Sequence, residues 1–154
     1  MTPRNYWLVK SEPGVFSFDD LMARPKRTTH WDGVRNYSAR NNLRAMKAGD
    51  LVLFYHSSAE PAAVVGIAEV AREAYPDPTA FDPNDPHYDA KSKRDEPTWY
   101  MVDIRAVEPL GRPVTLPEIK AAKELKNMAL VRLGRLSVQP VTPEEFETIK
   151  RLAK

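Results

Sequence analysis

The sequence predicts a mixed α/β (α+β) fold that occupies residues 1–154 as a single domain. Two kinds of segment alternate along the chain. Short runs of β-branched and aromatic residues, such as LVLFYH at 51–56, are typical of strands. Segments that open with a capping residue and an acid three positions on, such as TPEE at 142–145, are typical of helix starts. A length of 154 residues is enough to bury a core, and neither a repeat nor a linker divides it.

In the N-terminal half we expect strands and helices to alternate. Ser17 is a capping residue for a short helix that ends before Pro25. In the next helix Ala39, Leu43 and Met46 recur at the i, i+4, i+7 spacing of a buried face. Two strands follow, which we expect to pair antiparallel. The expected elements are strands over 5–10, 51–56 and 63–73, the last with Gly66 as a candidate bulge, and helices from 17 and over 36–47.

The C-terminal half begins with a proline-rich stretch over 75–97, which we expect to be a long loop that is functional or mobile. Further on, Thr115 and Thr142 each start a capping box, and Gly134 ends a helical turn. The expected elements are a strand over 98–107, a helix over 115–125, a helical turn over 127–133, a short edge segment at 137–139 and a closing helix from 142.

The composition excludes several kinds of chemistry. The chain has no cysteine, which removes disulfides, thiolate metal sites and a cysteine nucleophile. Its 3 histidines lack the spacing of a metal site, and nucleotide-binding fingerprints are absent, so we expect neither a metal nor a cofactor. No apolar run reaches the ~20 residues of a membrane helix, and the first residues do not have the pattern of a secretory leader, so we do not expect one. We therefore expect no membrane association and a cytoplasmic location, or a nuclear one in a eukaryote.

Charge is unevenly distributed, although the net charge is only +2. Residues 24–47 are rich in arginine and lysine, with Asp32 as the acid among them, whereas residues 73–96 are rich in acids. A basic surface of this kind suits a phosphate backbone, so we expect a nucleic-acid partner. Arg35 could instead form an ion pair with Asp32. The candidate phosphate contacts are Arg35, Arg40, Arg44 and Lys47.

Aromatic and hydrogen-bonding residues gather where the predicted strands and helices end. If the strands that end near 10 and 56 are neighbours, Ser11 and His56 come close together. A flat heterocycle needs an aromatic platform and a few donors and acceptors at its edge. Trp31 or Trp99 is the candidate platform, whereas Trp7, inside an apolar strand, is expected in the core. The candidate edge contacts are Ser11, Asn36, His56 and Ser137.

Two other functions stay open from the residues alone. A small enzyme acting on nucleic acid or a modified nucleoside could use His56 as base beside Lys10 or Ser11, or pair His30 with His56. The nucleophile elbow of a hydrolase is absent, so we do not expect catalysis. A scaffold protein without a working pocket is the second alternative.

Six ordered segments resemble the signature of the EVE domain family. They are YWLVKSEP at 6–13, WDGVRNYSARN at 31–41, MKAGD at 46–50, FYHS at 54–57, VGIAEV at 65–70 and RLSVQP at 135–140. The resemblance implies a PUA-like fold, a strongly bent β-barrel surrounded by helices, similar to that of the YTH and ASCH domains. It also implies a reader of modified bases, with modified cytosine in DNA and a modified base in RNA as the two candidate ligands.

The resemblance further implies where the base-binding pocket lies. A base can enter such a pocket only from a single strand or after it is flipped out of a duplex. Because flipping costs a few kcal/mol, we expect single-stranded nucleic acid to bind better. The implied pocket residues are Lys10, Ser11, Trp31, Gly33, Val34, Arg35, Asn36, Tyr55, His56, Ser57, Trp99, Arg135, Leu136 and Ser137.

Overall fold

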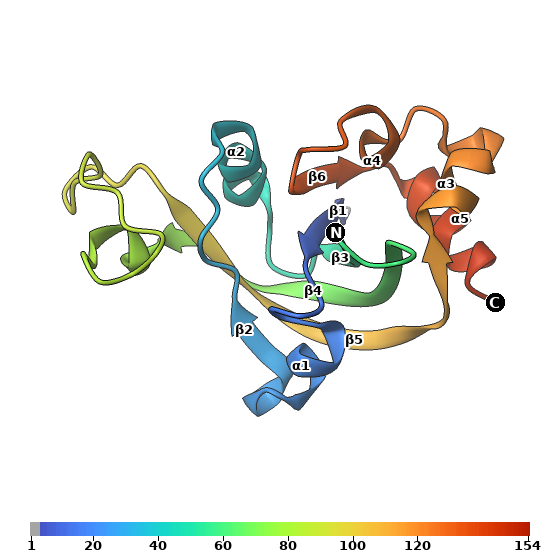
Figure 1. Cartoon of the computed structure of the whole chain (residues 1–154), viewed down its shortest axis with the longest axis horizontal. Coiled ribbons are helices and arrows are strands. Elements are labelled where there is room, and N and C mark those ends of the chain that lie inside the picture. Colours follow the sequence, from blue (N-terminus) through green and yellow to red (C-terminus); the bar gives the residue numbers. More distant parts are fainter. Residues whose placement is uncertain (1–3) are drawn as a thin grey trace.

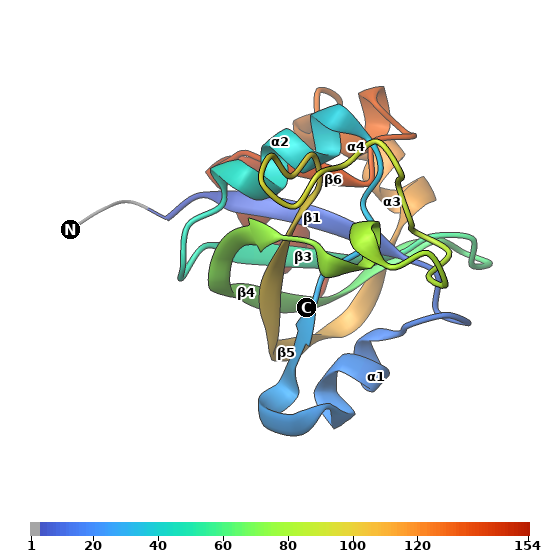
Figure 2. The same cartoon turned by 90° about the vertical axis from the view of Figure 1, so that its left-hand side faces the viewer.

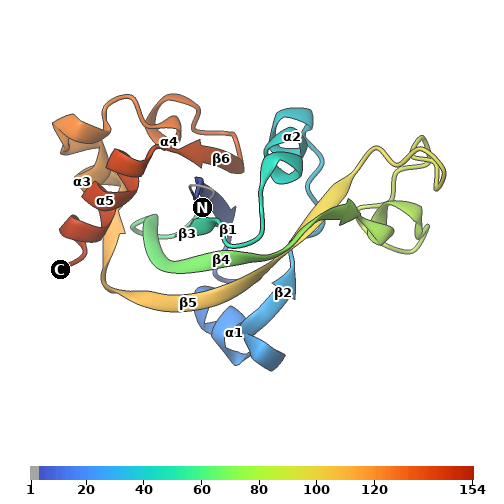
Figure 3. The same ribbon diagram turned by 180° about the vertical axis from the view of Figure 1, so that it is seen from behind.

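One mixed sheet organises the computed structural model, which describes residues 4–154 (Figure 1). Its strands are β1 (Tyr6–Ser11), β2 (Thr28–His30), β3 (Leu51–His56), β4 (Ala63–Pro76), β5 (Tyr100–Thr115) and β6 (Val138–Val141). They lie in the order β2-β5-β4-β3-β1-β6. β1 and β3 are parallel, and the other neighbours pair antiparallel. The two longest strands, β4 and β5, curve past the shorter ones, which gives the sheet its strong bend (Figure 3).

All the α-helices described except α4 begin at a residue whose side chain caps the helix. The α-helices are α1 (Phe18–Ala23), α2 (Tyr37–Ala45), α3 (Leu116–Ala121), α4 (Ala129–Arg132) and α5 (Pro143–Leu152). Thr115 and Thr142 form the predicted capping boxes, Ser17, predicted as a cap, also forms a box with Asp20, and Asn36 caps α2. Short 3₁₀ turns lie at Pro25–Arg27, Pro78–Phe81 and Lys123–Leu125. Within residues 4–154 no helix is long and apolar enough to cross a membrane.

The bent sheet separates two hydrophobic cores. The first contains Trp7 and Phe54 and is covered by α1 and α2, which lie at opposite ends of it (Figure 2). The second contains Leu8 and Leu53 and lies under α3, α4 and α5, at the other end of the molecule (Figure 1). Adjacent residues of one strand thus enter different cores, since successive side chains of a strand point to opposite faces. The prediction that Trp7 belongs to the core is confirmed, because only 7% of its surface is exposed.

The longest strands extend beyond their predicted ends. β4 and β5 pair from Ala63–Thr115 to Pro76–Tyr100, with several register shifts on the way. Local propensity falls off at the charged and proline residues of these segments, so the pairing of distant residues maintains the strands there. β5 begins at Tyr100, so Trp99 precedes the strand instead of lying within it, which corrects the prediction. The three-residue strand β2 was not predicted.

The helix that starts at Thr115 ends earlier than predicted. α3 stops at Ala121, and a 3₁₀ turn covers Lys123–Leu125. Ile119 and Leu125 are both fully buried. Residues six positions apart lie about 120° apart around a continuous helix, so the break allows both side chains to face one core.

The predicted antiparallel pair of β3 and β4 is confirmed, and its register shifts between Val64 and Gly66. Gly66 also lies against the ring of Phe18: a Cβ at this position would be 2.5 Å from that ring. Because the position is buried by an aromatic side chain of α1, it can hold only a glycine without movement of the helix.

The long excursion predicted over 75–97 covers residues 77–99, because β4 continues to Pro76, and it projects from the ends of β4 and β5 (Figure 1). The excursion is tied at its base, where the amide of Asp77 donates to the carbonyl of Trp99 at 3.0 Å. Asp77 and Ala80 are fully buried inside it. These contacts fold the proline-rich stretch back against the start of α2 (Figure 2).

Candidate nucleic-acid interface

The parallel strands β1 and β3 end side by side, and Ser11 pairs in register with His56. The predicted proximity of these two residues is confirmed. Both side chains are already hydrogen-bonded: the Ser11 hydroxyl donates to the Phe16 carbonyl at 2.6 Å, and His56 Nε2 accepts from the Phe18 amide at 3.1 Å. Burial lowers the pKa of His56 below its ordinary value, and the charge of Asp19 offsets part of this effect. His56 therefore holds α1 against the strand ends.

Lys10 precedes Ser11 in β1, so its side chain points to the other face of that strand. Its ammonium group donates to the carbonyl of Gly134 and lies 5.8 Å from the centre of the Tyr55 ring. Its backbone amide donates to the Ser137 carbonyl at 3.1 Å. Burial lowers the pKa of Lys10. Lys10 thus fastens the segment 133–137 to β1 and is separated by the strand from His56.

The segment between β2 and α2 begins with Trp31. The Trp31 amide donates to the carbonyl of Val102 at 2.7 Å. Its half-buried ring lies edge-on to the rings of Phe54 and Phe16, with centroids 5.5 and 6.4 Å away. Trp31 therefore packs on the first core with part of its surface open.

Gly33 occupies a position that requires glycine. Its φ is +78°, and a Cβ would lie 2.7 Å from Nε2 of His87. Its amide donates to the Asp77 carboxylate at 2.8 Å. The next residue, Val34, is buried in the first core. This segment is thus held to both the excursion and the core.

Arg35 directs its guanidinium into the protein. It donates to Asp77 at 3.1 Å, to Thr79 at 3.1 Å, to the carbonyl of Val34 at 2.9 Å and twice to the carbonyl of His87. All five N–H groups of the side chain are used in this way. Its ion-pair partner is Asp77, where the sequence suggested Asp32. The geometry therefore gives Arg35 a structural role and leaves it no donor for the phosphate contact that the sequence suggested.

The carboxylate of Asp77 accepts hydrogen bonds at both oxygens. Oδ2 accepts from the Gly33 amide and from Arg35, and Oδ1 accepts from the amide and the hydroxyl of Thr79. Burial by itself raises the pKa of this carboxyl group. The hydrogen bonds from Thr79, Gly33 and Arg35 outweigh burial and hold the pKa below its ordinary value. A signal for this residue is present in the sequence, because Asp77 precedes Pro78 and caps the 3₁₀ turn, but nothing local identifies its partners.

Trp99 is 6% exposed and lies beneath Tyr37, with the two rings stacked at a centroid distance of 5.1 Å. The Trp99 Nε1 donates to the Asp89 carboxylate at 2.7 Å, and the Arg35 guanidinium lies 5.4 Å from its ring. With these neighbours its ring is not an open platform. The exposed aromatic residue at this place is Tyr37, which the sequence did not single out.

A cleft of about 400 Å³ lies between the start of α2 and the segment before β6, and is called the interface cleft below. It is lined by Asn36, Ser38, Leu133, Gly134, Arg135 and Leu136. Three predicted site residues line it, Asn36, Arg135 and Leu136. Lys10 bonds to the same segment by donating to the carbonyls of Gly134 and Ser137. The buried Gln139 amide fixes that segment by donating to the carbonyls of Leu133 and Leu136 at 3.3 and 2.8 Å.

The remaining predicted residues lie elsewhere. His56 lines a second cavity of about 400 Å³, together with Pro61, Val65 and Arg112. Tyr55 is buried in the second core. The amide of Ser57 donates to the Ser11 carbonyl at 2.9 Å beyond the ends of the strands. The structure thus distributes the predicted set over the two sides of the strand ends.

The basic residues of α2 and of the turn after it include two arginines that contact the end of the excursion and the start of β5. Arg40 lies 5.1 Å from the ring centre of Tyr37 and donates to the Thr98 carbonyl at 3.0 Å. Arg44 is exposed and lies 4.7 Å from the ring centre of Tyr100, and Lys47 is exposed after the helix. Cations and aromatic rings thus alternate along this surface, a pattern suited to single-stranded nucleic acid.

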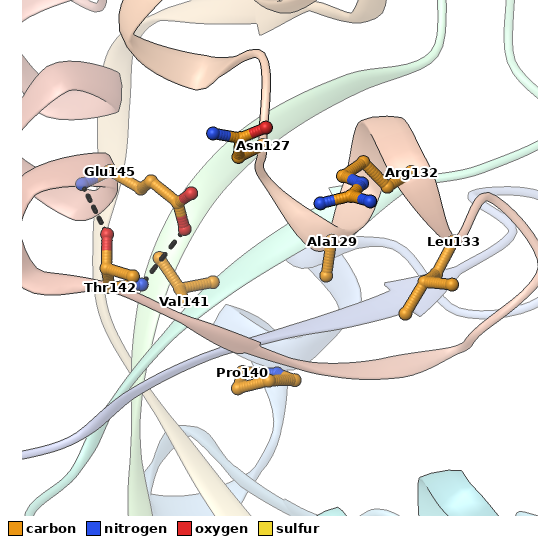
Figure 4. A pocket seen from close by; sticks show the side chains of 8 residues that line it. All are labelled: Asn127, Ala129, Arg132, Leu133, Pro140, Val141, Thr142 and Glu145. Carbon is orange, nitrogen blue, oxygen red and sulfur yellow. Dashed lines mark hydrogen bonds between the residues drawn. The ribbon is translucent and has the colours of Figure 1, made fainter.

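A further cavity, of about 490 Å³, lies between α4, β6 and the start of α5 (Figure 4). Two of its polar residues cap α5: the carboxylate of Glu145 accepts from the Thr142 amide at 3.0 Å, and the Thr142 hydroxyl accepts from the Glu145 amide. None of the predicted site residues lines this cavity. Among residues 4–154, moreover, no three acidic, cysteine or histidine side chains gather as metal ligands.

A strongly bent mixed sheet with helices packed around it is a PUA-like fold, as the sequence resemblance implied. The chain belongs to the EVE domain family, whose pattern it matches over residues 5–152. It is 49% identical to thymocyte nuclear protein 1 of Rattus norvegicus, over 96% of this chain and 73% of that protein.

Solved structures agree with this assignment. The crystal structure of human THYN1 protein in complex with 5-methylcytosine containing DNA superposes with a TM-score of 0.93, at 47% identity, over 97% of this chain and 98% of the other. The YTH domain of Zygosaccharomyces rouxii MRB1 protein, in complex with N6-methyladenosine RNA, has a TM-score of 0.56 over 98% of this chain and 87% of the other. At 15% identity this second similarity concerns the fold alone.

Proposed function

We propose that this chain is a reader of a modified base in nucleic acid and that it holds the base in the interface cleft. The observation that carries the proposal is the similarity to the human THYN1 protein, which binds 5-methylcytosine containing DNA and is 47% identical over nearly the whole chain. The cleft volume of about 400 Å³ falls within the ~300–1,000 Å³ of small-ligand pockets.

The residues that would contact the base follow from the geometry. Asn36 uses its Oδ1 to cap α2, at 2.9 Å from the Ala39 amide, which leaves the NH₂ group of its side chain for a ligand. Ser38 and Arg135 add polar groups, and Leu136 adds an apolar one. Trp31 stays our proposed wall for the base on the sequence argument alone, since its half-buried ring packs on Phe54 and Phe16 and is not among the residues that line the cleft. Trp99 is omitted because Tyr37 covers it.

The test is a fluorescence-anisotropy panel at fixed salt with plain and modified single-stranded DNA and RNA. The modified bases are 5-methylcytosine, 5-hydroxymethylcytosine and N6-methyladenine. A buried methyl group contributes ~0.8 kcal/mol, so we expect a preference of at least about fourfold for one modified base. The same panel decides between DNA and RNA.

Variants test whether Trp31 contributes to the preference. Trp31→Ala should remove the preference and leave weak, salt-sensitive binding, whereas Trp31→Phe, which keeps an aromatic face, should retain it. Thermal melting of both variants checks that they fold. Equal affinity of the wild type for all oligonucleotides would contradict the reading function, and an unchanged preference in folded Trp31→Ala would contradict the wall.

The geometry gives little support to the alternative of an enzyme. The Nε2 atom of His56 is occupied by a backbone amide, and the Ser11 hydroxyl donates to a carbonyl. Lys10 lies across the strand from His56, and His30 bonds to Asp103 at 3.0 Å on a different part of the sheet. Turnover of oligonucleotides or modified nucleosides that disappears in His56→Ala would revive this alternative.

For the location, the vertebrate relatives are named thymocyte nuclear proteins, which favours the nuclear alternative if this chain comes from a eukaryote. The expected cytoplasmic location has no such support. Imaging of a tagged full-length chain in its own cell would test it.

A further inference from the structure

Tyr37 presents an aromatic ring at the surface beside the interface cleft. It is the first residue of α2 and lies between Asn36 and Ser38, which both line the cleft. The residue is 61% exposed, more than any other tryptophan, tyrosine or phenylalanine among the described residues. An aromatic ring at this place is available to a ligand that extends beyond the cleft.

The ring of Tyr37 is held in place from beneath. It stacks on Trp99 at 5.1 Å with an interplanar angle of 27°. Trp99 in turn is fixed by its hydrogen bond to Asp89 and by its contact with Arg35. A ring that is already oriented loses little conformational freedom when a base stacks on it.

Cations flank the same ring. Arg40 lies 5.1 Å from its centre, and exposed Arg44 follows one turn later on α2. Positive charge beside an aromatic platform is complementary to a nucleotide, since the platform takes the base and the cations take the phosphates. The alternative role of the Tyr37–Trp99 stack is purely structural: it would only hold α2 against the excursion at 77–99.

We infer that Tyr37 is a second platform, which stacks the nucleobase adjacent to the one held in the interface cleft. This inference rests on the proposed function and adds a neighbouring subsite to it. Because every base has a stacking face, the subsite increases affinity without selecting sequence or modification. The occupant is a base of a single-stranded segment.

The experiment compares two single-stranded oligonucleotides, each with 5-methylcytosine at the centre. One has ordinary bases on both sides, and the other has abasic sites there. Tyr37→Ala should weaken binding of the first oligonucleotide at least about fivefold and leave binding of the second unchanged. Tyr37→Phe should behave as the wild type. The matched control is Tyr88→Ala, a partly exposed tyrosine of the excursion (44% exposed), which should bind both oligonucleotides as the wild type does.

Equal losses of affinity on both oligonucleotides would mean that Tyr37 only supports the fold, and no loss on either would remove the subsite. The reading function is measured separately, as the ratio of affinities for modified and plain oligonucleotides. A flank-dependent effect of Tyr37→Ala without a modified-base preference would keep the platform and reject the reader. A modified-base preference without the flank-dependent effect would keep the reader and reject the platform. Absence of any binding by the wild type would overturn both the reader and the platform.

Discussion

The amide of Gly33 donates a hydrogen bond of 2.8 Å to the carboxylate of Asp77, a residue 44 positions further along the chain. The same carboxylate binds the guanidinium of Arg35. Asp77 is fully buried, so both contacts are shielded from water. The segment that leads into α2 is therefore held by the base of the excursion, and the geometry of the interface cleft depends on a residue outside it.

Replacement of Asp77 should destabilise the protein and loosen the site. In Asp77→Asn the carboxylate charge is removed and donors of Gly33, Arg35 or Thr79 are left without an acceptor. We expect a decrease of about 2–3 kcal/mol in the free energy of unfolding, measured by urea denaturation. Asp85→Asn, in the same excursion but on a partly exposed residue, is the control and should change stability little. A wild-type midpoint for Asp77→Asn would contradict this role.

The free energy of unfolding should also depend on pH because Asp77 titrates at a different pKa in the folded protein. Its pKa is held below the ordinary value in the folded protein, so the folded state binds fewer protons than the unfolded one. The contribution of Asp77 is therefore complete above the unfolded pKa of about 3.9 and is lost as the pH falls through the folded pKa. Urea unfolding of the wild type between about pH 5 and 2 should lose stability more steeply than that of Asp77→Asn. Parallel curves would show that other groups dominate acid unfolding.

Gly33→Ala should destabilise the protein by about 1–2 kcal/mol, mainly because an L-residue is strained at a φ of +78°. The new methyl group would also displace His87, whose half-exposed side chain can move. The expected fall in Tm is about 2–8 °C for a chain of this size. His87→Ala in the same protein should recover only the steric part.

Gly14→Ala provides the comparison for Gly33→Ala, because nothing lies within 4 Å of a Cβ at Gly14. Its Tm should stay close to that of the wild type. Equal effects of the two substitutions would mean that the backbone at Gly33 is not the constraint.

The cations of α2 should determine the salt dependence of binding. Arg40→Gln combined with Arg44→Gln should weaken binding to every single-stranded sequence alike. The slope of log affinity against log salt should flatten by about 0.7 for each phosphate that the variant no longer neutralises. Lys120→Gln with Lys123→Gln, exposed cations of the α3 region at the far end of the molecule, is the matched control. An unchanged slope in the α2 variant would exclude this face from the interface.

Much of the fold follows from local sequence. Ser17, Thr115 and Thr142 predict helix starts because their side chains satisfy amide groups within three residues, whatever the rest of the chain does. The strand at 51–56 is predicted for the same local reason, from its β-branched and aromatic residues. The family assignment also needed only the order of motifs in the sequence.

The candidate site was only partly predictable from the same information. Asn36, Arg135 and Leu136 were expected there and line the interface cleft. The burial of Trp99 under Tyr37, the use of Arg35 by Asp77 and the separation of Lys10 from His56 were not foreseen. Each of these depends on which residues 40 or more positions apart meet, and on which face of a strand a side chain lies. The sequence by itself thus determined the family and the local elements, since caps and propensities act within a few residues. The tertiary structure alone decided which of the candidate residues share a cleft, because that depends on strand register and on contacts between distant segments.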